Sequence, residues 1–352
     1  MGKYLIGFVI LCCIISCKRF EKSDAKTIIH IDLEKMHKID IRESYMKQIC
    51  LTDNGKPALV DEVKKILFVE DQYIIQCRNN VLAFDAQTGI KKMSFSAQGR
   101  ALAEFIHLWD TWMEYQVICI YDMNGKKVLR YNLNGNFLEA ISVSDKASSH
   151  PFQVLAKAND DYYVGKRVYS GSETAELALY DKNFEFVKEI GDLKIESGIY
   201  LGYPFFVYTP SEILYYRYLY NDIYAIDDKQ NVTVKYYVDF GENNVPLNPN
   251  LKDEYDRIDF VNNSKKNYAT LVSNIYESDK YFCFRFAFDG EKCLGVYDKS
   301  SDQTASFVFV SSSESPHADV YVFDDKALLV TQDMDKTCLT TINIDDLLKN
   351  NL

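Results

Sequence analysis

Three of the five histidines are candidates for a shared chemical site. His107, His150 and His317 lie in or beside the expected starts of the second, third and sixth units of an internal repeat, where loops would approach a common channel. Imidazoles that converge there could bind a metal or act as acid–base groups near neutral pH. Three unrelated loop or strand histidines, which are commoner, would give the same pattern. No HExxH, Walker, dinucleotide or nucleophile-elbow motif occurs, and no cofactor or metal is expected.

Two tryptophans and one arginine are candidates for ligand binding. Trp109 and Trp112 lie three apart in LWDTWMEY, the expected hairpin between the first two strands of the second unit. Exposed together, they would stack on a sugar or anchor a peptide. The alternative is packing between neighbouring units, which the usual burial of Trp favours. Arg217, in YYRYLY, could bind a carboxylate at the channel or form a cross-strand salt bridge.

The elements that would position these residues follow a repeat. A strand ends in Asp or Asn, a tight turn follows, and another strand begins, since Asp and Asn tolerate left-handed backbone and bond their own main chain. The copies end at Asp85, Asn132, Asp181, Asp227, Asp298 and, in degenerate form, Asn343. Apart from the step between Asp227 and Asp298, the spacing is close to the ~40–50 residues of a propeller blade. A polar insertion, 242–267, explains the longer step and could hold a short helix around 253–260.

Four strands in each of six units predict an all-β fold, a six-bladed β-propeller with four-stranded antiparallel blades. The expected blades are 63–95, 103–144, 151–190, 203–240, 268–311, and 318–343 completed by 46–52. The last unit has only three strands before a short polar helix at 344–350, so an N-terminal strand must close the ring. Segment 46–52 is the favoured donor and segment 28–33 is its rival. Seven blades or a pair of sandwiches are the competing folds.

The N-terminal segment has the features of an export signal. Residues 1–17 contain Lys3, an apolar run and Cys17, and the run is too short to span a bilayer. Ile14-Ile15-Ser16-Cys17 is similar to a bacterial lipobox, which predicts lipidation of Cys17 and a linker at 18–26. An ordinary cleaved signal or an anchor helix is the alternative. The lipoprotein interpretation predicts a lipid anchor in the outer membrane, on either its periplasmic or its exterior side.

Composition narrows the class of protein further. The net charge of −11 argues against nucleic acid as a partner, because phosphates require a basic face. The 26 Tyr and 21 Phe favour β structure. Outside the signal, six cysteines stand isolated in alternating apolar segments, which predicts buried free thiols rather than zinc ligands or disulfides. They are Cys50, Cys77, Cys119, Cys283, Cys293 and Cys338.

Several segments together resemble a known family. QICLTDNGKPALVDEVKKILFVEDQYIIQCRNNVLAFDAQTG resembles the opening blade of six-bladed β-propeller lipoproteins of the Bacteroidetes, and LYNDIYAID and YYVDFGENNVP match two further motifs of that family. The loop QGRALAEF keeps the family's Gly99, Glu104 and Phe105 but lacks its Pro, and Cys50-Leu51-Thr52 replaces a Pro-Leu-Glu segment. The resemblance covers about 28 to the end. It implies the fold and an envelope location, but no activity.

The leading functional hypothesis is a lipid-anchored envelope protein that binds or scaffolds a protein, peptide or glycan across one mouth of the ring. The alternative is an envelope hydrolase or lyase with a channel-mouth site of His107, His150 and His317. A purely structural accessory of a surface complex is a third possibility. The sequence favours a binding protein over an enzyme, because no catalytic motif accompanies the histidines.

Overall fold

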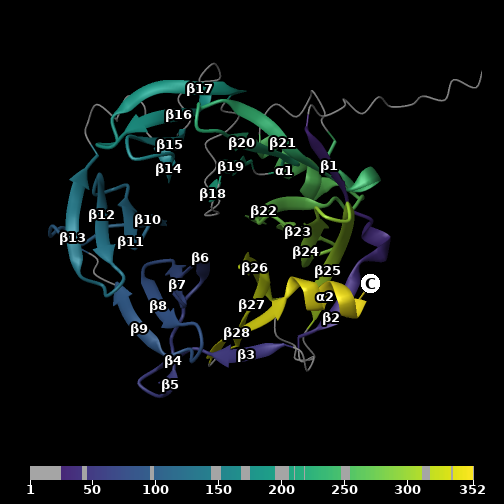
Figure 1. The fold of residues 1–352 in the computed structure, drawn as a ribbon, viewed down its shortest axis with the longest axis horizontal. Coiled ribbons are helices and arrows are strands. Elements are labelled where there is room, and N and C mark those ends of the chain that lie inside the picture. Colours follow the sequence, from purple (N-terminus) through teal and green to yellow (C-terminus); the bar gives the residue numbers. More distant parts are fainter. Residues whose placement is uncertain are drawn as a thin grey trace, which may run out of the picture.

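The computed structural model describes residues 25–41, 46–95, 99–143, 152–167, 175–194, 206–209, 211–217, 219–246, 254–310, 318–333 and 336–351. Cys17, His150 and His317 lie outside these ranges. Six sheets, each with four antiparallel strands, stand around a central axis (Figure 1), which confirms the predicted six-bladed β-propeller.

The first three blades each contain four consecutive strands, ordered from the axis outwards. Blade one comprises β6 (Val63–Val69), β7 (Gln72–Cys77), β8 (Val81–Asp85) and β9 (Lys91–Phe95). Blade two comprises β10 (Leu108–Glu114), β11 (Val117–Asp122), β12 (Lys127–Asn132) and β13 (Phe137–Ser142). Blade three comprises β14 (Phe152–Lys157), β15 (Tyr162–Arg167), β16 (Ala175–Asp181) and β17 (Phe186–Lys194).

The last three blades each recruit one strand from the N-terminal segment. Blade four comprises β18 (Phe206–Tyr208), β19 (Ile213–Tyr216), β20 (Asp222–Ile226), β21 (Val232–Asp239) and, outermost, β1 (Thr27–His30). Blade five comprises β22 (Thr270–Glu277), β23 (Tyr281–Phe288), β24 (Glu291–Asp298), β25 (Gln303–Val310) and, outermost, β2 (His37–Asp40). Blade six comprises β26 (Asp319–Phe323), β27 (Lys326–Asp333), β28 (Lys336–Asn343) and β3 (Lys47–Cys50).

Shorter elements connect or flank the blades. They are η1 (Leu33–Lys35), the hairpin of β4 (Thr52–Asp53) and β5 (Lys56–Pro57), η3 (Gly241–Asn243), α1 (Glu254–Asn263) and α2 (Ile344–Asn351). The helix α1 stands in the insertion before blade five, and α2 follows the last strand of blade six. None of the helices in the described ranges has the length and apolarity required to cross a membrane.

The recurring Asp closes the turn between the third and fourth strands. The Asp181 carboxylate accepts hydrogen bonds from the backbone N–H groups of Asn183 (2.8 Å) and Glu185 (2.9 Å). In blade one, hydrogen bonds from the hydroxyl and backbone N–H of Thr88 lower the pKa of Asp85 to about 2. The side-chain oxygen of Asp, or of Asn132 in blade two, thus satisfies N–H groups that the strands leave unpaired, which explains why the motif recurs in blades one to five.

The loop shared with the resembled family is held by its retained residues. The backbone N–H of Gly99 donates to the carbonyl of Phe105 (2.9 Å), and the Glu104 carboxylate accepts from the N–H of Ala101 (3.0 Å). A Cβ on Gly99 would collide with the Glu104 carboxylate. Phe105 is fully buried in the core between blades one and two. These three residues therefore shape and anchor the loop that leads into blade two.

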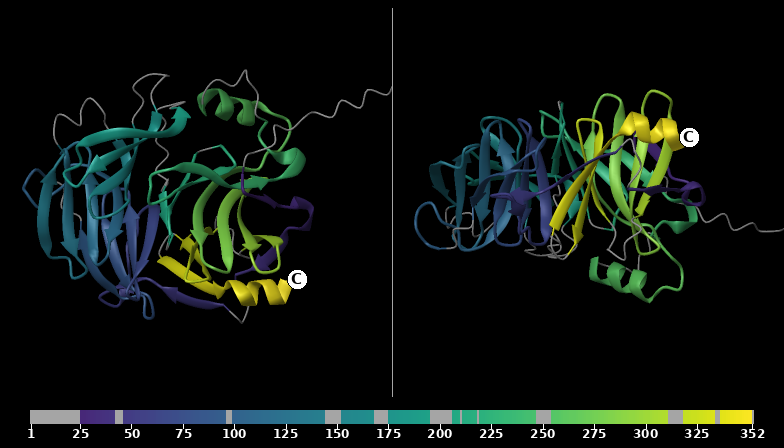
Figure 2. Two further views of the ribbon diagram at one scale, coloured as in Figure 1. Left: turned by 45° about the horizontal axis from the view of Figure 1, so that its top comes forward. Right: turned by 90° about the horizontal axis from the view of Figure 1, so that it is seen from below.

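The N-terminal segment forms a belt around half of the ring (Figure 2). The strands β1 and β2 add in parallel to β21 and β25, and β3 adds antiparallel to β28. Closure by β3 confirms 46–52 as the donor to the last blade. The rival, 28–33, instead supplies most of the fifth strand of blade four. The belt buries Ile29 (0% exposed) and Ile39 (3%) in two neighbouring cores, which joins it to the propeller.

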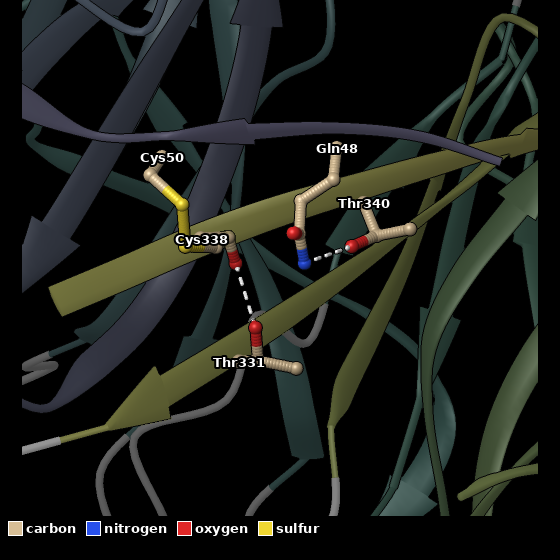
Figure 3. Close-up of a disulfide and its surroundings, with 5 residues drawn as sticks. All are labelled: Gln48, Cys50, Thr331, Cys338 and Thr340. Carbon is tan, nitrogen blue, oxygen red and sulfur yellow. Dashed lines mark hydrogen bonds between the residues drawn. A yellow bond between two sulfur atoms is a disulfide. The ribbon is translucent and has the colours of Figure 1, made fainter. Parts of the chain in front are cut away.

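A disulfide links the closing strand to its partner (Figure 3). Cys50 of β3 lies opposite Cys338 of β28, and the two are bonded across 288 residues of sequence. The prediction of free thiols is therefore wrong for this pair, because spacing along the sequence cannot show which strands meet at the closure. The other four cysteines of the body are buried and free, as predicted. Burial raises the pKa of the Cys77 and Cys293 thiols to about 12, so both remain protonated and unreactive.

Candidate functional site

The two faces of the ring carry different loops. The entry face carries the loops that enter the innermost strands and the turns between second and third strands, including His107, Arg217 and α1. The hairpin face carries the turns between first and second and between third and fourth strands, including Asp71, Asp324 and α2. The two helices project from opposite faces (Figure 2). Every candidate of the sequence analysis that the structure describes, except Trp112, lies towards the entry face.

His107 and Trp109 are positioned by one buried carboxylate on the entry face. Asp122 is fully buried and accepts the backbone N–H groups of Ile106 (2.8 Å) and His107 (3.1 Å), which holds the loop before β10. The His107 side chain is exposed, and its ring centroid lies 5.6 Å from that of Trp109. Because His150 and His317 lie outside the described residues, a three-histidine site remains a prediction. Within the described part of the chain, no three His, Cys, Asp or Glu side chains are grouped as metal ligands would be.

The tryptophans do not form the predicted exposed platform. Both belong to the strand β10 rather than to a hairpin, since residues 104–107 form the loop held by Asp122. Trp112 is 3% exposed in the core between blades two and three, and its indole N–H donates to Glu114 (3.0 Å). Trp109 lies where the register shifts and packs, half-buried, against the same core. The alternative interpretation, packing between blades, describes this pair.

Glu114 gathers a polar cluster between blades two and three. Besides Trp112, the Tyr163 hydroxyl donates to its carboxylate (2.8 Å), and Arg130 pairs with it (3.1 Å). Arg130 also donates to the Tyr163 hydroxyl (2.9 Å). Since a buried carboxylate is stable only when its lone pairs are satisfied, these donors tie the two blades together.

Arg217 connects blades three and four. It is 8% exposed, its guanidinium lies 3.9 Å from the centroid of the Tyr220 ring, and it donates to the Tyr224 hydroxyl (3.3 Å). A carboxylate oxygen of Glu176, on blade three, lies 3.9 Å from its guanidinium. Arg257 of α1 also lies over Tyr220, at 4.4 Å, and donates to the Leu219 carbonyl (2.9 Å). These contacts hold α1 and two blades together at the entry face.

Ion pairs on this face join blades one and two, three and four, and five and six. Each blade contributes one charged residue to its pair, and the side chains involved are at most 24% exposed. The pairs are Lys65–Asp110 (2.9 Å) between blades one and two, Glu176–Arg217 (3.9 Å) between three and four, and Arg285–Asp319 (2.8 Å) between five and six. These six charged side chains are therefore engaged in holding neighbouring blades.

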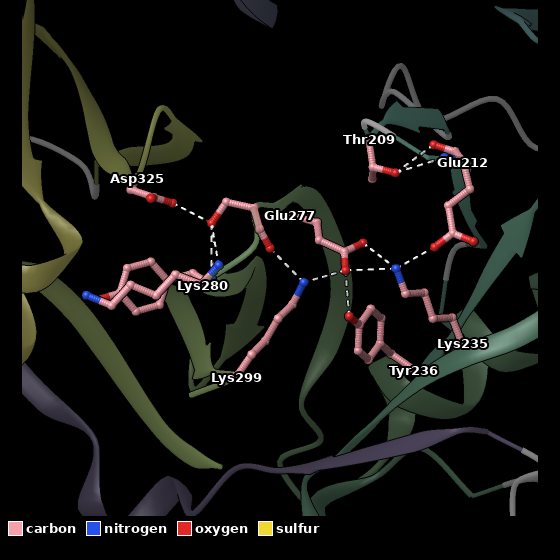
Figure 4. Close-up of polar contacts among 10 residues, drawn as sticks. Thr209, Glu212, Lys235, Tyr236, Glu277, Lys280, Lys299 and Asp325 are labelled. Carbon is pink, nitrogen blue, oxygen red and sulfur yellow. Dashed lines mark hydrogen bonds and ion pairs between the residues drawn. The ribbon is translucent and has the colours of Figure 1, made fainter. Parts of the chain in front are cut away.

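A charge network also joins blades four and five on the hairpin face (Figure 4). Glu277, at the end of β22, accepts hydrogen bonds from Lys299 (2.6 Å), Lys235 (2.8 Å) and the Tyr236 hydroxyl (2.6 Å). Burial alone would raise the pKa of Glu277, but these donors outweigh it and lower the pKa below its usual value. Lys235 also pairs with Glu212. The Glu277 carboxylate thus accepts hydrogen bonds from both blades and holds blade four against blade five.

A groove opens between blades six and one on the same face. Its volume is about 410 Å³, and the aromatic rings of Phe68, Tyr73 and Phe323 line it. Polar side chains surround these rings: Lys47, Asp71, Gln87, Asp324, Lys326, Thr341 and Asn343. Sequence reasoning missed this groove, because its walls come from opposite ends of the chain and meet only at the ring closure.

The fold and the closure define a disulfide-linked six-bladed β-propeller with an N-terminal belt. The model of a domain of unknown function, DUF4934, matches residues 52–351, and the chain belongs to this family. Among curated proteins, none matches the chain significantly.

Two solved structures from Bacteroides share the fold. A protein of Bacteroides fragilis described as exported has a TM-score of 0.65 at 16% identity, over 90% of this chain and 99% of its own. A member of the DUF4221 family from Bacteroides vulgatus has a TM-score of 0.53 at 11% identity, over 84% of this chain and 95% of its own. At such identities the likeness concerns the fold alone. It agrees with the resemblance to Bacteroidetes propellers.

Proposed function

We propose that this chain is a lipid-anchored binding protein of the cell envelope and that its hairpin face receives the ligand. The observation that carries the proposal is the groove between blades six and one. Ion pairs join neighbouring blades on both faces, but the hairpin face also opens this groove, which has aromatic walls and an exposed polar rim. Preformed concave sites with a few polar groups are typical of ligand binding on rigid scaffolds.

Two features support an exported protein. Disulfides persist in oxidising compartments outside the cytoplasm, and Cys50–Cys338 closes the ring. The N-terminal 17 residues carry the signal and lipobox pattern. The Bacteroides fragilis protein of the same fold is also described as exported.

The belt determines where a lipid anchor would attach. Ala25 leads into β1 at the outer edge of blade four, so an anchor at Cys17 would join the rim of the ring rather than either face. An extended chain covers at most about 3.5 Å per residue, so eight residues keep the rim within about 28 Å of the membrane. Attachment at the rim leaves the hairpin face open to a ligand.

The location is tested by producing the full-length chain in a Bacteroides host with an alkyne-labelled palmitate. We expect the label on the wild-type protein in the outer-membrane fraction and its loss from Cys17→Ala. A Cys17→Ala variant that keeps the label or remains in the membrane fraction would contradict the anchor. Cys13→Ala, a change inside the apolar run, is the matched control and should leave labelling unchanged.

The face is tested by the retention of purified mature chain on isolated cell envelopes. We expect Asp71→Asn combined with Asp324→Asn, on the hairpin face, to reduce retention at least tenfold. His107→Ala, at an exposed residue of the entry face, should leave retention unchanged. The opposite ranking of the two variants would reject the hairpin face.

A further inference from the structure

We propose that the groove between blades six and one binds a neutral oligosaccharide. The inference rests on the proposed binding role and names the ligand class. The volume of about 410 Å³ lies within the range of roughly 300–1,000 Å³ that small-molecule sites occupy. Three features of the groove indicate the chemical class of the ligand: its aromatic walls, its polar rim and its rigidity.

The walls offer aromatic surface suited to sugar rings. The centroid of Phe68 lies 5.4 Å from that of Tyr73 and 6.2 Å from that of Phe323, so one aromatic cluster spans both blades. Phe68 and Phe323 are half-buried and keep part of their surface open. An exposed aromatic face presents negative potential, to which the C–H groups on the apolar side of a sugar are attracted. Within the described part of the chain, the Tyr73 hydroxyl has no hydrogen-bond partner, and it lines the groove.

Two carboxylates are fixed on opposite walls. Glu70 and Asp71 have φ values of 45° and 56°, and Asp324 and Asp325 have 49° and 55°. Two successive left-handed residues form the tight two-residue turn that matches strand twist, so each hairpin tip is closely constrained. Asp71 therefore projects from blade one and Asp324 from blade six at defined positions. Because their backbone is already ordered, binding loses little conformational entropy at these two residues.

The rim is balanced in charge and rich in both donors and acceptors. Lys47 and Lys326 provide donors, Asp71 and Asp324 provide acceptors, and the amides of Gln87 and Asn343 provide both. In the described part of the chain, none of the four charged groups forms an ion pair with another residue. Sugar hydroxyls donate and accept in turn, which suits such a rim. With two positive and two negative groups, the rim offers no net attraction to an anionic or a cationic ligand.

The closure keeps one wall of the groove in register. Lys47 of β3 lies opposite Thr341 of β28, and both line the groove. The Cys50–Cys338 disulfide lies in the same ladder and prevents β3 from slipping. The groove is therefore preformed, a condition that reduces the entropy cost of binding a small ligand.

The test uses the purified mature chain and saturation-transfer NMR, followed by calorimetry. The probes are tetrasaccharides of glucose, mannose, galactose, xylose and N-acetylglucosamine, with tetragalacturonate and the tripeptide Lys-Phe-Asp for comparison. We expect at least one neutral tetrasaccharide to bind, and Phe323→Ala or Asp324→Asn to weaken it at least tenfold. Asn tolerates left-handed backbone, so Asp324→Asn preserves the turn if Phe323→Ala destabilises the blade.

The matched control is Tyr115→Ala. Tyr115 is an aromatic residue on the hairpin face, 81% exposed and outside the groove, so its loss should leave affinity unchanged. The proposal is overturned if no neutral probe binds, if a charged probe binds more tightly, or if binding survives both groove substitutions. Binding to purified protein does not depend on Cys17, so a failed anchor with intact sugar binding would reject only the proposed location. An intact anchor without sugar binding would reject only the ligand class.

Discussion

Cys50 and Cys338 face each other in the ladder between β3 and β28, where a disulfide joins strands that are 288 residues apart. The bond lies where the third strand of the belt, β3, completes the last blade. A propeller loses an open edge by such closure, and the covalent link prevents the closing strand from leaving. The stability of the ring should therefore depend on the redox state of this pair.

We expect the loss of this disulfide to lower the free energy of unfolding by about 2–5 kcal/mol, because the open chain regains loop entropy. Cys50→Ala with Cys338→Ala should unfold at a lower urea concentration than the wild type. A thiol reductant should shift the wild type by a similar amount and leave the double variant unchanged. Equal urea midpoints for the oxidised wild type and the double variant would contradict a stabilising role. Mass spectrometry of the unfolded, alkylated mature chain should report these two cysteines as bonded.

The number of blades could be predicted because its signal is local. Each Asp that ends a third strand, such as Asp181, accepts N–H groups two to four residues onwards, so a short stretch of sequence is enough to predict the turn. The belt has no such local signal. Thr27 pairs with Tyr236, and the parallel pairing of β1 gives the same alternating pattern as any edge strand. The alternation in segment 28–33 therefore predicts a strand but does not indicate the blade to which that strand adds.

The candidate site could be predicted less well than the fold. Trp112 and Arg217 are residue types common at binding sites, but both are held in contacts between blades that only the packed ring shows. For the groove the error runs the other way, because residues that look structural in the sequence form a candidate binding site. Phe68 and Phe323 read as ordinary core residues in their own strands, and they become a groove wall only because blades one and six meet.

The belt provides a matched pair of adjacent isoleucines. Ile29 is fully buried in the core of blades four and five, whereas Ile28 is 37% exposed. We expect Ile29→Ala to lower the free energy of unfolding by about 2–5 kcal/mol, as for other buried large-to-small changes. Ile28→Ala should change it by less than about 1 kcal/mol. Urea denaturation measures both, and equal effects would show that β1 does not pack as described.

The network around Glu277 predicts a specific dependence on pH. The pKa of Glu277 is lowered in the folded state, so its contribution to stability is complete above the unfolded value near 4.5. The contribution is lost as the pH falls through the lower, folded pKa. We expect Glu277→Gln to lower the free energy of unfolding by about 3 kcal/mol at pH 7, because it leaves the half-buried Lys235 and Lys299 short of a counter-charge. Below pH 4 the difference from the wild type should shrink.

Glu242→Gln is the control for this prediction. Glu242 is 94% exposed and lies 3.7 Å from Lys266, which is also at the surface. An exposed pair of this kind contributes about 0–1 kcal/mol. Urea titrations at pH 7 and at pH 3.5 should separate the two variants at the higher pH only. An effect of Glu277→Gln that is independent of pH would reject the ionic origin of its stabilisation.

Gly295→Ala should destabilise the protein, although replacing a glycine inside a strand by alanine usually stabilises it. Replacing Gly by Ala in a strand interior normally gains about 0.5–1 kcal/mol, because the unfolded chain loses freedom. Gly295 of β24 lies opposite Phe284 of β23, and a Cβ on it would stand 2.4 Å from the tip of that ring. Phe284 is fully buried and cannot move aside without disturbing the core, so Gly295→Ala should cost about 1–3 kcal/mol. In a Phe284→Leu background the same change should cost at least about 1 kcal/mol less, because the ring tip is absent. A double-mutant cycle by urea denaturation measures this coupling, and additive effects would show that the ring does not cover the glycine.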